Sequence, residues 1–376
     1  MSASLAIWAL TPKGAILSRK LADQLAPVDR FISFRLSKDH PDAQFFSSIA
    51  QTINDNFTHY SGHIFIMATG IVVRSIACLL VHKTKDPAVV VVDEAGKFAI
   101  SLIAGHLGGA NELALQVAQI TRGQAVITTA TDVNQVPAID LLAKEKKLKI
   151  DNPDAIKSVN ISILMKKPIA IYDPYKQILN DQFKVPPWPA APHIINADSS
   201  EDQIRTRLKT AAAGVCIDDK VRRELGARVL VLRPSTLVVG MGCNRNTSKQ
   251  EMQDLLERIL KKFDLAIDSV DTLASIDLKA DEPGLLQLAR QFNFTLTFFT
   301  RSQLKQVDHV PTPSAVVNQH IGVNSVCEAA AILGARNGNL IIPKHKSPNV
   351  TIAIARRGFT SSVSDQETLT TSPNGQ

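Results

Sequence analysis

Short apolar runs alternate along this chain with stretches of helical period, and this alternation limits the folds that are open to it. A run such as Ala88–Val92 (AVVVV) has no polar position, so a strand formed there must be covered on both faces. Helical stretches such as Asn111–Thr121 stand between these runs. The pattern predicts a multi-domain α/β chain with mostly parallel, open sheets and helices on both faces.

The length and the interruptions of the pattern predict the domain organisation. With 376 residues, the chain is long enough for two or three domains. The proline-rich stretch KVPPWPAAPH interrupts the alternation and predicts an irregular loop. We expect an N-terminal α/β domain over residues 1–136, a middle domain with this loop over 137–234, a C-terminal α/β domain over 235–357 and a disordered tail over 358–376.

The charge of the chain points to a small anionic ligand more than to a polymer. Lys and Arg number 42 and Asp and Glu 35, which gives a net charge of +7. This excess is spread evenly, whereas a nucleic-acid arm would concentrate it in one segment. Aromatic residues make up only 5%, too few for base-stacking platforms. We therefore expect no nucleic-acid partner.

The spacing of the cysteines and the length of the apolar stretches indicate whether to expect a metal site, disulfides or a membrane span. The four cysteines are widely spaced, and no Cys/His pattern has the spacing of a zinc site. No disulfide framework is expected, which favours a reducing compartment. The apolar stretches are too short for a membrane span, and the N-terminus lacks the features of a signal peptide. We expect a cytoplasmic protein without a metal site or a membrane partner.

The first polar cluster follows a predicted strand at MATGIVVR (residues 67–74). The strand runs into Thr69-Gly70, where a helix begins, and the N–H groups of a helix start can hold a carboxylate or phosphate. Arg74 could add a bidentate contact. The alternative is an ordinary strand-to-helix turn with a surface arginine, and the spacing alone favours that alternative.

The second cluster is GHLGGANE (residues 105–112). Gly108 and Gly109 would let the backbone approach a ligand closely. His106 can act as an acid or a base near neutral pH, and Asn111 or Glu112 could cap the helix or bind substrate. A turn whose glycines only shape the backbone explains the same residues equally well.

The third cluster, TTATD, places hydroxyl groups and the carboxylate of Asp132 after another predicted strand. Ligands of open α/β sheets bind at the carboxyl ends of strands, where all three clusters are expected. This convergence favours a functional interpretation of each cluster. A helix cap is the alternative for Thr131 and Asp132.

Three features of the C-terminal segment also have a functional and a structural interpretation. Gly240-Met-Gly242 is similar to the start of a dinucleotide-binding loop, which would make the protein a nucleotide-dependent oxidoreductase, but Arg245 occupies the third glycine position. The segment Ser275–Glu282 combines acids with a lysine and could supply a base, a cation and an acid, or it is a solvent-facing loop. Cys327 is expected to pack in the core.

Taken together, these segments resemble the cobalt-precorrin-5A hydrolase (CbiG) family. MATGIVVRSIA, DPAVVVVDEAGKFAISL, GHLGGANELA, ITTATD and PAIDLLAKEK are similar to its N-terminal signature. VVGMGCNRNTS, LASIDLKADE, GVNSVCEAAA and NVTIAIAR are similar to its C-terminal domain, which also resembles a small stand-alone protein of the aerobic pathway. The segments follow one another in order from Gly62 to Arg357.

The resemblance implies a hydrolase of anaerobic cobalamin biosynthesis. In this reaction water opens the δ-lactone of cobalt-precorrin-5A, and acetaldehyde leaves to give cobalt-precorrin-5B. The cobalt belongs to the corrinoid substrate, so no cofactor is expected. Other enzymes of the pathway are candidate partners. The alternative is a non-catalytic corrinoid-binding or channelling protein.

The roles that lactone opening requires can be assigned as hypotheses. His106 or Asp132 is the expected general base, and Glu112 is a further catalytic candidate. Backbone N–H groups around Gly108 and Gly109 could bind the oxyanion. Arg74 could hold an acetate or propionate group, and Lys279, with Asp277 and Glu282, could close the site from the C-terminal domain. The other residues expected to bind substrate are Thr69, Gly70, Gly105, Asn111, Thr129 and Thr131.

Overall fold

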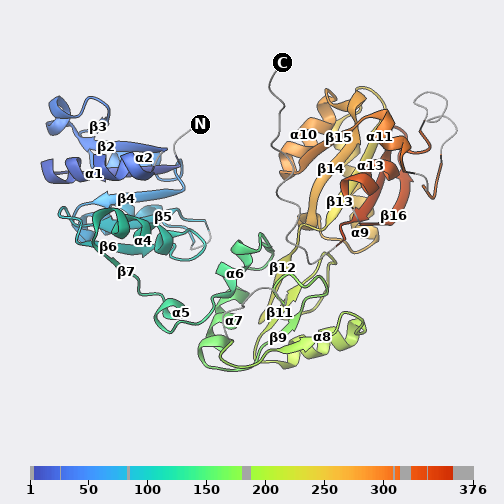
Figure 1. Cartoon of the computed structure of the whole chain (residues 1–376), viewed down its shortest axis with the longest axis horizontal. Helices are drawn as coiled ribbons and strands as arrows, with labels where there is room; N and C mark the ends of the chain where they lie inside the picture. Colours follow the sequence, from blue (N-terminus) through green and yellow to red (C-terminus); the bar gives the residue numbers. More distant parts are fainter. Residues whose placement is uncertain are drawn as a thin grey trace, which may run out of the picture. The chain divides into compact units, whose positions relative to one another are not determined.

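The computed structural model describes residues 4–25, 27–82, 85–179, 188–307, 310–313, 323–336 and 338–358. Its contacts divide the chain into two compact units, residues 1–144 and 145–376. The first unit holds one sheet and the second holds two (Figure 1). Most strand pairs are parallel, which confirms the predicted α/β class. The predicted tail lies outside the described residues from residue 359 onward.

The sheet of the first unit has seven strands in the order β3-β2-β1-β4-β5-β6-β7. They are β1 (Leu5–Ala9), β2 (Val28–Ser33), β3 (Gln44–Phe46), β4 (Gly62–Ile66), β5 (Ala88–Val92), β6 (Phe98–Ile103) and β7 (Gln124–Val126). The strands β1 to β5 are parallel to one another. The direction then reverses, because β6 is antiparallel to β5 and β7 is parallel to β6.

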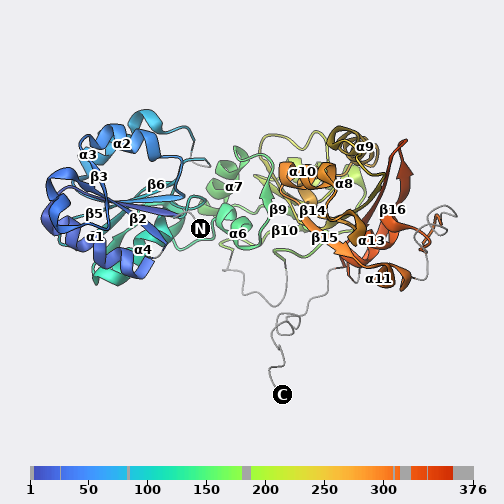
Figure 2. The same ribbon diagram turned by 90° about the horizontal axis from the view of Figure 1, so that it is seen from above.

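Helices cover both faces of this sheet, as the fully apolar strands require. The main helices are α1 (Pro12–Leu25), α2 (Ile49–Asn56), α3 (Thr69–Ile76), α4 (Ala110–Thr121), α5 (Ala130–Val133) and α6 (Ile139–Glu145), with short 3-10 turns at Phe34–Asp39 and Ala77–Leu79. The helices α1 and α4 pack on one face of the sheet, and α2 and α3 on the other (Figure 2). Alternate residues of β1, such as Ile7 and Trp8, therefore enter different cores.

A buried histidine lies in the second of these cores. His63 stacks between the rings of Phe57 and Phe65, and it is fully buried. The indole N–H of Trp8 donates to its Nδ1 (3.1 Å), so the proton lies on Nε2, which donates to the carbonyl of Phe57 (2.9 Å). Burial lowers the pKa of His63 to about 4.

We expect the stability of the protein to fall as the pH decreases from 6.5 towards 4. Over this range the unfolded chain, with a histidine pKa near 6.5, takes up a proton that the buried His63 does not. The loss amounts to about 3 kcal/mol in the free energy of unfolding. Urea unfolding at a series of pH values measures it, and a His63→Phe variant should show a flatter dependence. If the free energy of unfolding depends on pH equally in both proteins, His63 is not the residue responsible.

The first sheet of the second unit is small and has the order β10-β9-β11-β12-β8. Its strands are β8 (Lys149–Ile150), β9 (Ala170–Tyr172), β10 (His193–Ile195), β11 (Gly214–Ile217) and β12 (Val229–Arg233), with helices α7 (Ala155–Leu164) and α8 (Glu201–Thr210). Only β8 runs antiparallel to its neighbour. The proline-rich stretch (residues 184–193) follows β9 and ends at His193, the first residue of β10. Residues 180–187, which include the first four residues of this stretch, are outside the described residues.

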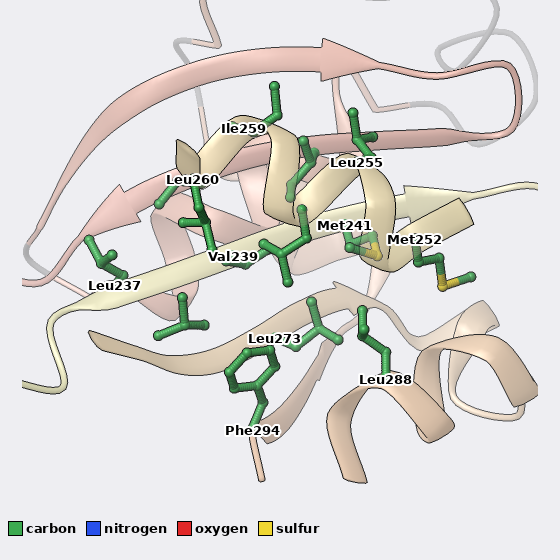
Figure 3. Packing of buried hydrophobic residues seen from close by; sticks show 14 of the residues in the cluster. Leu237, Val239, Met241, Met252, Leu255, Ile259, Leu260, Leu273, Leu288 and Phe294 are labelled. Carbon is green, nitrogen blue, oxygen red and sulfur yellow. The ribbon is translucent and has the colours of Figure 1, made fainter. Parts of the chain in front are cut away.

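The other sheet of this unit has the order β15-β14-β13-β17-β16. Its strands are β13 (Leu237–Cys243), β14 (Val270–Ile276), β15 (Thr295–Phe299), β16 (Asn339–Lys346) and β17 (Val350–Arg356). Its helices are α9 (Lys249–Lys262), α10 (Pro283–Phe292), α11 (Arg301–Lys305) and α13 (Val326–Gly334), with 3-10 turns at Ile267–Ser269 and Asp277–Lys279. Figure 3 shows apolar side chains of α9, among them Leu255 and Ile259, in one core with side chains of the sheet such as Val239 of β13.

Buried polar contacts join the two sheets of the second unit. Asp219 is fully buried and accepts hydrogen bonds from Thr236 Oγ1 (2.7 Å) and from Arg356 Nε (2.6 Å). The backbone of residues 219–221 also pairs with residues 264–266. None of the described helices is long and apolar enough to cross a membrane.

Candidate functional site

The reversal between β5 and β6 decides which polar clusters meet. Ile103, at the end of β6, pairs with Val89, near the start of β5. The loops after β6 and β7 therefore lie together at the amino-terminal edge of the parallel strands. Thr69, Gly70 and Arg74 follow β4 and lie at the opposite edge of the sheet. The expected convergence is thus correct for the second and third clusters and wrong for the first.

His106 is the centre of the cluster that forms at this edge. Its Nε2 lies 2.8 Å from Oδ2 of Asp132, and its Nδ1 lies 3.3 Å from Oδ2 of Asp140. The hydroxyl of Thr131 is 3.1 Å from Nε2. The exposed fractions of the side chains are 14% for His106, 36% for Asp132 and 8% for Asp140. The imidazole is therefore enclosed between a buried and a partly exposed carboxylate.

Asp132 is held through one of its two oxygens. Its Oδ2 accepts hydrogen bonds from His106, from Asn111 Nδ2 (3.1 Å) and from the hydroxyl of Thr129. Among the described residues, no side chain donates to Oδ1 of Asp132. With an exposed fraction of 36%, the carboxylate can offer this second oxygen to a water molecule or a ligand.

Asn111 is part of the framework of the site. Its Oδ1 accepts from Ser101 Oγ (2.7 Å), and its Nδ2 donates to Thr129 Oγ1 (3.0 Å) as well as to Asp132. The residue is buried. These contacts use both ends of the amide, so Asn111 links β6 to the start of α5 and fixes the orientation of Asp132.

The glycines of the second cluster allow a tight loop under His106. A Cβ on Gly105 would lie 2.8 Å from Asn111 Oδ1, and one on Gly108 would lie 2.4 Å from the Cβ of Ala104. Gly109 has a φ of +90°, which other residues rarely adopt. Its N–H donates to the carbonyl of His106 (3.0 Å), so it is not free to bind an oxyanion as predicted. Among the described residues, none accepts from the N–H of Gly108.

Electrostatics set the protonation state of the site. The hydrogen bond to Asp140 outweighs burial and, together with Asp132, raises the pKa of His106 to about 9. Burial acts to raise the pKa of Asp132, but hydrogen bonds from Thr129 and His106 bring it below its usual value. At neutral pH, His106 is therefore an imidazolium that contacts the ionised carboxylate of Asp132. Of the two predicted general bases, only Asp132 can accept a proton in this state.

Several predicted residues lie outside this cluster. Glu112 is exposed and accepts a hydrogen bond from Gln116 (3.4 Å), one turn along α4. Arg74 is exposed, and its guanidinium folds back over Gly70 at the other edge of the sheet. The structure therefore does not bring Glu112, Thr69, Gly70 or Arg74 into contact with His106.

Asp277, Lys279 and Glu282 belong to the second unit. Glu282 has an exposed fraction of 1% and no hydrogen-bond donor among the described residues. Lys279 Nζ lies 3.9 Å and Arg245 3.7 Å from its Oε2, while Asp277 is exposed. Arg245 also pairs with Asp281 (2.5 Å), a contact that sequence reasoning missed. The two cations are thus already balanced by neighbouring acids.

Helix packing explains the glycine of the dinucleotide-like motif. A Cβ on Gly240 would lie 1.9 Å from the carbonyl oxygen of Cys327 and 2.7 Å from the N of Ala331. Gly240 therefore lets α13 contact β13 closely, and the motif gives no support to nucleotide binding. Cys327 is buried in the core, in agreement with the predicted packing role.

The structure also bears on metal ligation and disulfides. No group of three His, Cys, Asp or Glu side chains within the described ranges has a geometry that could hold a metal ion. In the His106 cluster, the two carboxylates lie on opposite ring nitrogens. All four cysteines are unpaired.

Three family models match the chain, one after another. They are Cobalamin synthesis G N-terminal over residues 51–132, Cobalamin biosynthesis central region over 137–234 and Cobalamin synthesis G C-terminus over 237–355. Together they span most of the chain and include both His106 and Asp140, under different models.

Curated relatives agree with these models. A cobalt-precorrin-5A hydrolase of Priestia megaterium is 32% identical, with 93% of this chain and 94% of the relative covered. The enzyme of that name from Salmonella typhimurium is 33% identical over 93% and 97%. Protein CobE of a Sinorhizobium species is 35% identical over 32% of this chain and 79% of its own length. The chain therefore belongs to the CbiG family of cobalamin biosynthesis proteins.

Proposed function

We propose that this protein is a cobalt-precorrin-5A hydrolase that opens the δ-lactone of its substrate at the His106 cluster. The names of the relatives at 32% and 33% identity support the reaction. The observation that carries the location of the site is the imidazolium of His106 between the carboxylates of Asp132 and Asp140. Water and the corrinoid are the only reactants, and acetaldehyde and cobalt-precorrin-5B are the products.

In this mechanism Asp132 is the general base. A water molecule on its Oδ1 gives up a proton as its oxygen attacks the lactone carbonyl carbon. The N–H of Gly108 is the backbone donor proposed for the oxyanion. The bond between the acyl carbon and the ring oxygen then breaks.

His106 is the general acid of the same cycle. Its imidazolium protonates the oxygen that leaves the acyl carbon. The proton on Asp132 then returns to Nε2 of His106 across the 2.8 Å contact, which restores both groups. Lactone opening thus balances without any other reactant. In the following step the substrate's own cobalt macrocycle takes up the electrons as acetaldehyde leaves.

The proposal also covers the cofactor, the anchoring of the substrate, the location of the protein and its partners. The cobalt is carried by the substrate, and no cofactor of the protein takes part. Arg74 is proposed to hold a peripheral acetate or propionate away from the reacting lactone, since it lies at the other edge of the sheet. The proposed location is the cytoplasm, in line with the unpaired cysteines, and other enzymes of the pathway are the proposed partners.

The direct test is acetaldehyde release from cobalt-precorrin-5A by the purified protein, measured with a coupled alcohol dehydrogenase. We expect acetaldehyde in proportion to the corrinoid consumed. Binding of the corrinoid, seen as a change in its absorption spectrum, without acetaldehyde would overturn the proposal and favour a channelling protein.

The rate of acetaldehyde release should fall as the pH rises through about 9, where His106 loses its proton. The reason is that neutral His106 cannot protonate the leaving oxygen. The dependence of kcat on pH between 6 and 10 measures this. A rate that keeps increasing with pH above 9 would show that His106 acts as a base instead.

A further inference from the structure

A short helix brings a second carboxylate against His106 from the side opposite Asp132. Asp140 lies in the first turn of α6, and its Oδ2 is 3.3 Å from His106 Nδ1. The side chain of Asp140 is 8% exposed, so water screens this contact little. Each ring nitrogen of His106 therefore faces its own carboxylate.

The same helix contacts the glycine-rich loop at a second point. Lys144, one turn after Asp140, donates from Nζ to the carbonyl of Leu107 (3.3 Å). Ile139, Leu142 and Ala143 of α6 are buried and hold the helix in place. Packing therefore holds one side of α6, and the contacts of Asp140 with His106 and of Lys144 with Leu107 hold the side that faces the loop.

The two carboxylates differ in what else they can do. Asp132 is partly exposed and has an oxygen without a side-chain donor, so it can reach a reactant. Asp140 is buried and lies against Nδ1 of His106, the ring nitrogen that Asp132 does not contact. This is the geometry of a group that orients a catalytic imidazole and stabilises its charged form.

We propose that Asp140 is the positioning residue of the site: it accepts the Nδ1 proton of His106, turns Nε2–H towards Asp132 and keeps the imidazole charged. Its role in turnover rests on the proposed function, but its effect on His106 does not. The hydrogen bond that His106 donates to Asp140 is the largest contribution that raises the pKa of His106, and the one to Asp132 is the second. The other charged group that α6 brings to this loop is Lys144, which donates to the carbonyl of Leu107.

The titration of His106 tests the proposal without any substrate. Its imidazole signal in proton NMR is assigned by its loss in a His106→Gln variant. Asp140→Asn should weaken proton binding to His106 at least about tenfold, a shift of about one pH unit or more to lower pH. Asp140→Glu should recover part of the shift. Glu145→Gln removes an exposed carboxylate from the same helix and should change nothing.

The outcomes separate positioning from a purely structural role. If Asp140 only stabilises α6, Asp140→Asn will lower the melting temperature and leave the titration of a still folded protein unmoved, which would overturn the proposal. If it positions His106, kcat in Asp140→Asn should decrease at a lower pH than in the wild type, with KM little changed. A shifted titration in a protein that releases no acetaldehyde would refute the proposed function and leave the positioning intact.

Discussion

Replacing Asp132 by asparagine should lower acetaldehyde release from cobalt-precorrin-5A by roughly 10²–10⁴-fold, the usual contribution of a general base. Asparagine has the same shape and still accepts from His106 and Asn111 through its amide oxygen. It cannot take a proton from water, however, and it removes the charge that favours the imidazolium of His106. The loss should therefore fall on kcat, while the corrinoid still binds.

Rates at saturating substrate and a spectroscopic binding titration measure the two effects separately. Glu145→Gln is the matched control, since Glu145 is an exposed carboxylate that does not contact His106. It should turn over at the wild-type rate. Near wild-type turnover by Asp132→Asn would remove Asp132 from the mechanism, and a loss of binding alone would make it a substrate contact.

Gly240→Ala should strongly destabilise the second unit, with a cost of about 4 kcal/mol or more in the free energy of unfolding. The added Cβ would lie 1.9 Å from a carbonyl oxygen and 2.7 Å from a backbone nitrogen of α13. Backbone atoms cannot move aside by changing rotamer, so α13 would have to shift away from β13. That shift would open the core in which Cys327 and Ala331 are buried.

Urea unfolding of the full chain measures this cost, with Gly226→Ala as the control. Gly226 has a φ of +89° but open space around the position of its Cβ. Its replacement should therefore cost only about 1 kcal/mol of backbone strain. If Gly240→Ala proves no more costly than Gly226→Ala, then α13 does not pack on β13 as closely as described.

Strands buried on both faces could be predicted well from the sequence. AVVVV predicted β5 at its observed bounds, because a run without polar positions has few alternatives. In contrast, β14 was not predicted, although it lies inside its sheet. Its sequence VDTLASI contains Thr272 and Ser275, which are buried, and Ser275 donates to the carbonyl of Met241 (2.7 Å). These polar residues interrupt the apolar pattern of a buried strand, and the hydrogen bonds that allow their burial form only in the folded protein.

The reversal at β5 and β6 can be inferred from the length of one turn. Only residues 93–97 (DEAGK) separate the two strands, which is too short for the crossover that parallel neighbours need. Gly96, with a φ of +69°, allows this tight connection. Because β6 must then run against β5, the turn length by itself predicts that Arg74 and His106 lie at opposite edges of the sheet.

About half of the site could be predicted. His106 and Asp132 follow β6 and β7, which are neighbours, so their meeting follows from the strand order. Asp140 could not be assigned in this way, because its contact depends on which side α6 turns towards the loop. The pKa of His106, and with it the assignment of base and acid, depends on that same contact.

The central claim, that water opens the lactone at the His106 cluster, can be tested most directly in water enriched in oxygen-18. In a single turnover of cobalt-precorrin-5A, mass spectrometry should find one heavy oxygen in the carboxylate of the corrinoid product, with an equal amount of acetaldehyde released. Asp132→Asn should give neither under the same conditions. A product without the heavy oxygen, or equal labelling by the Asp132→Asn variant, would contradict the account.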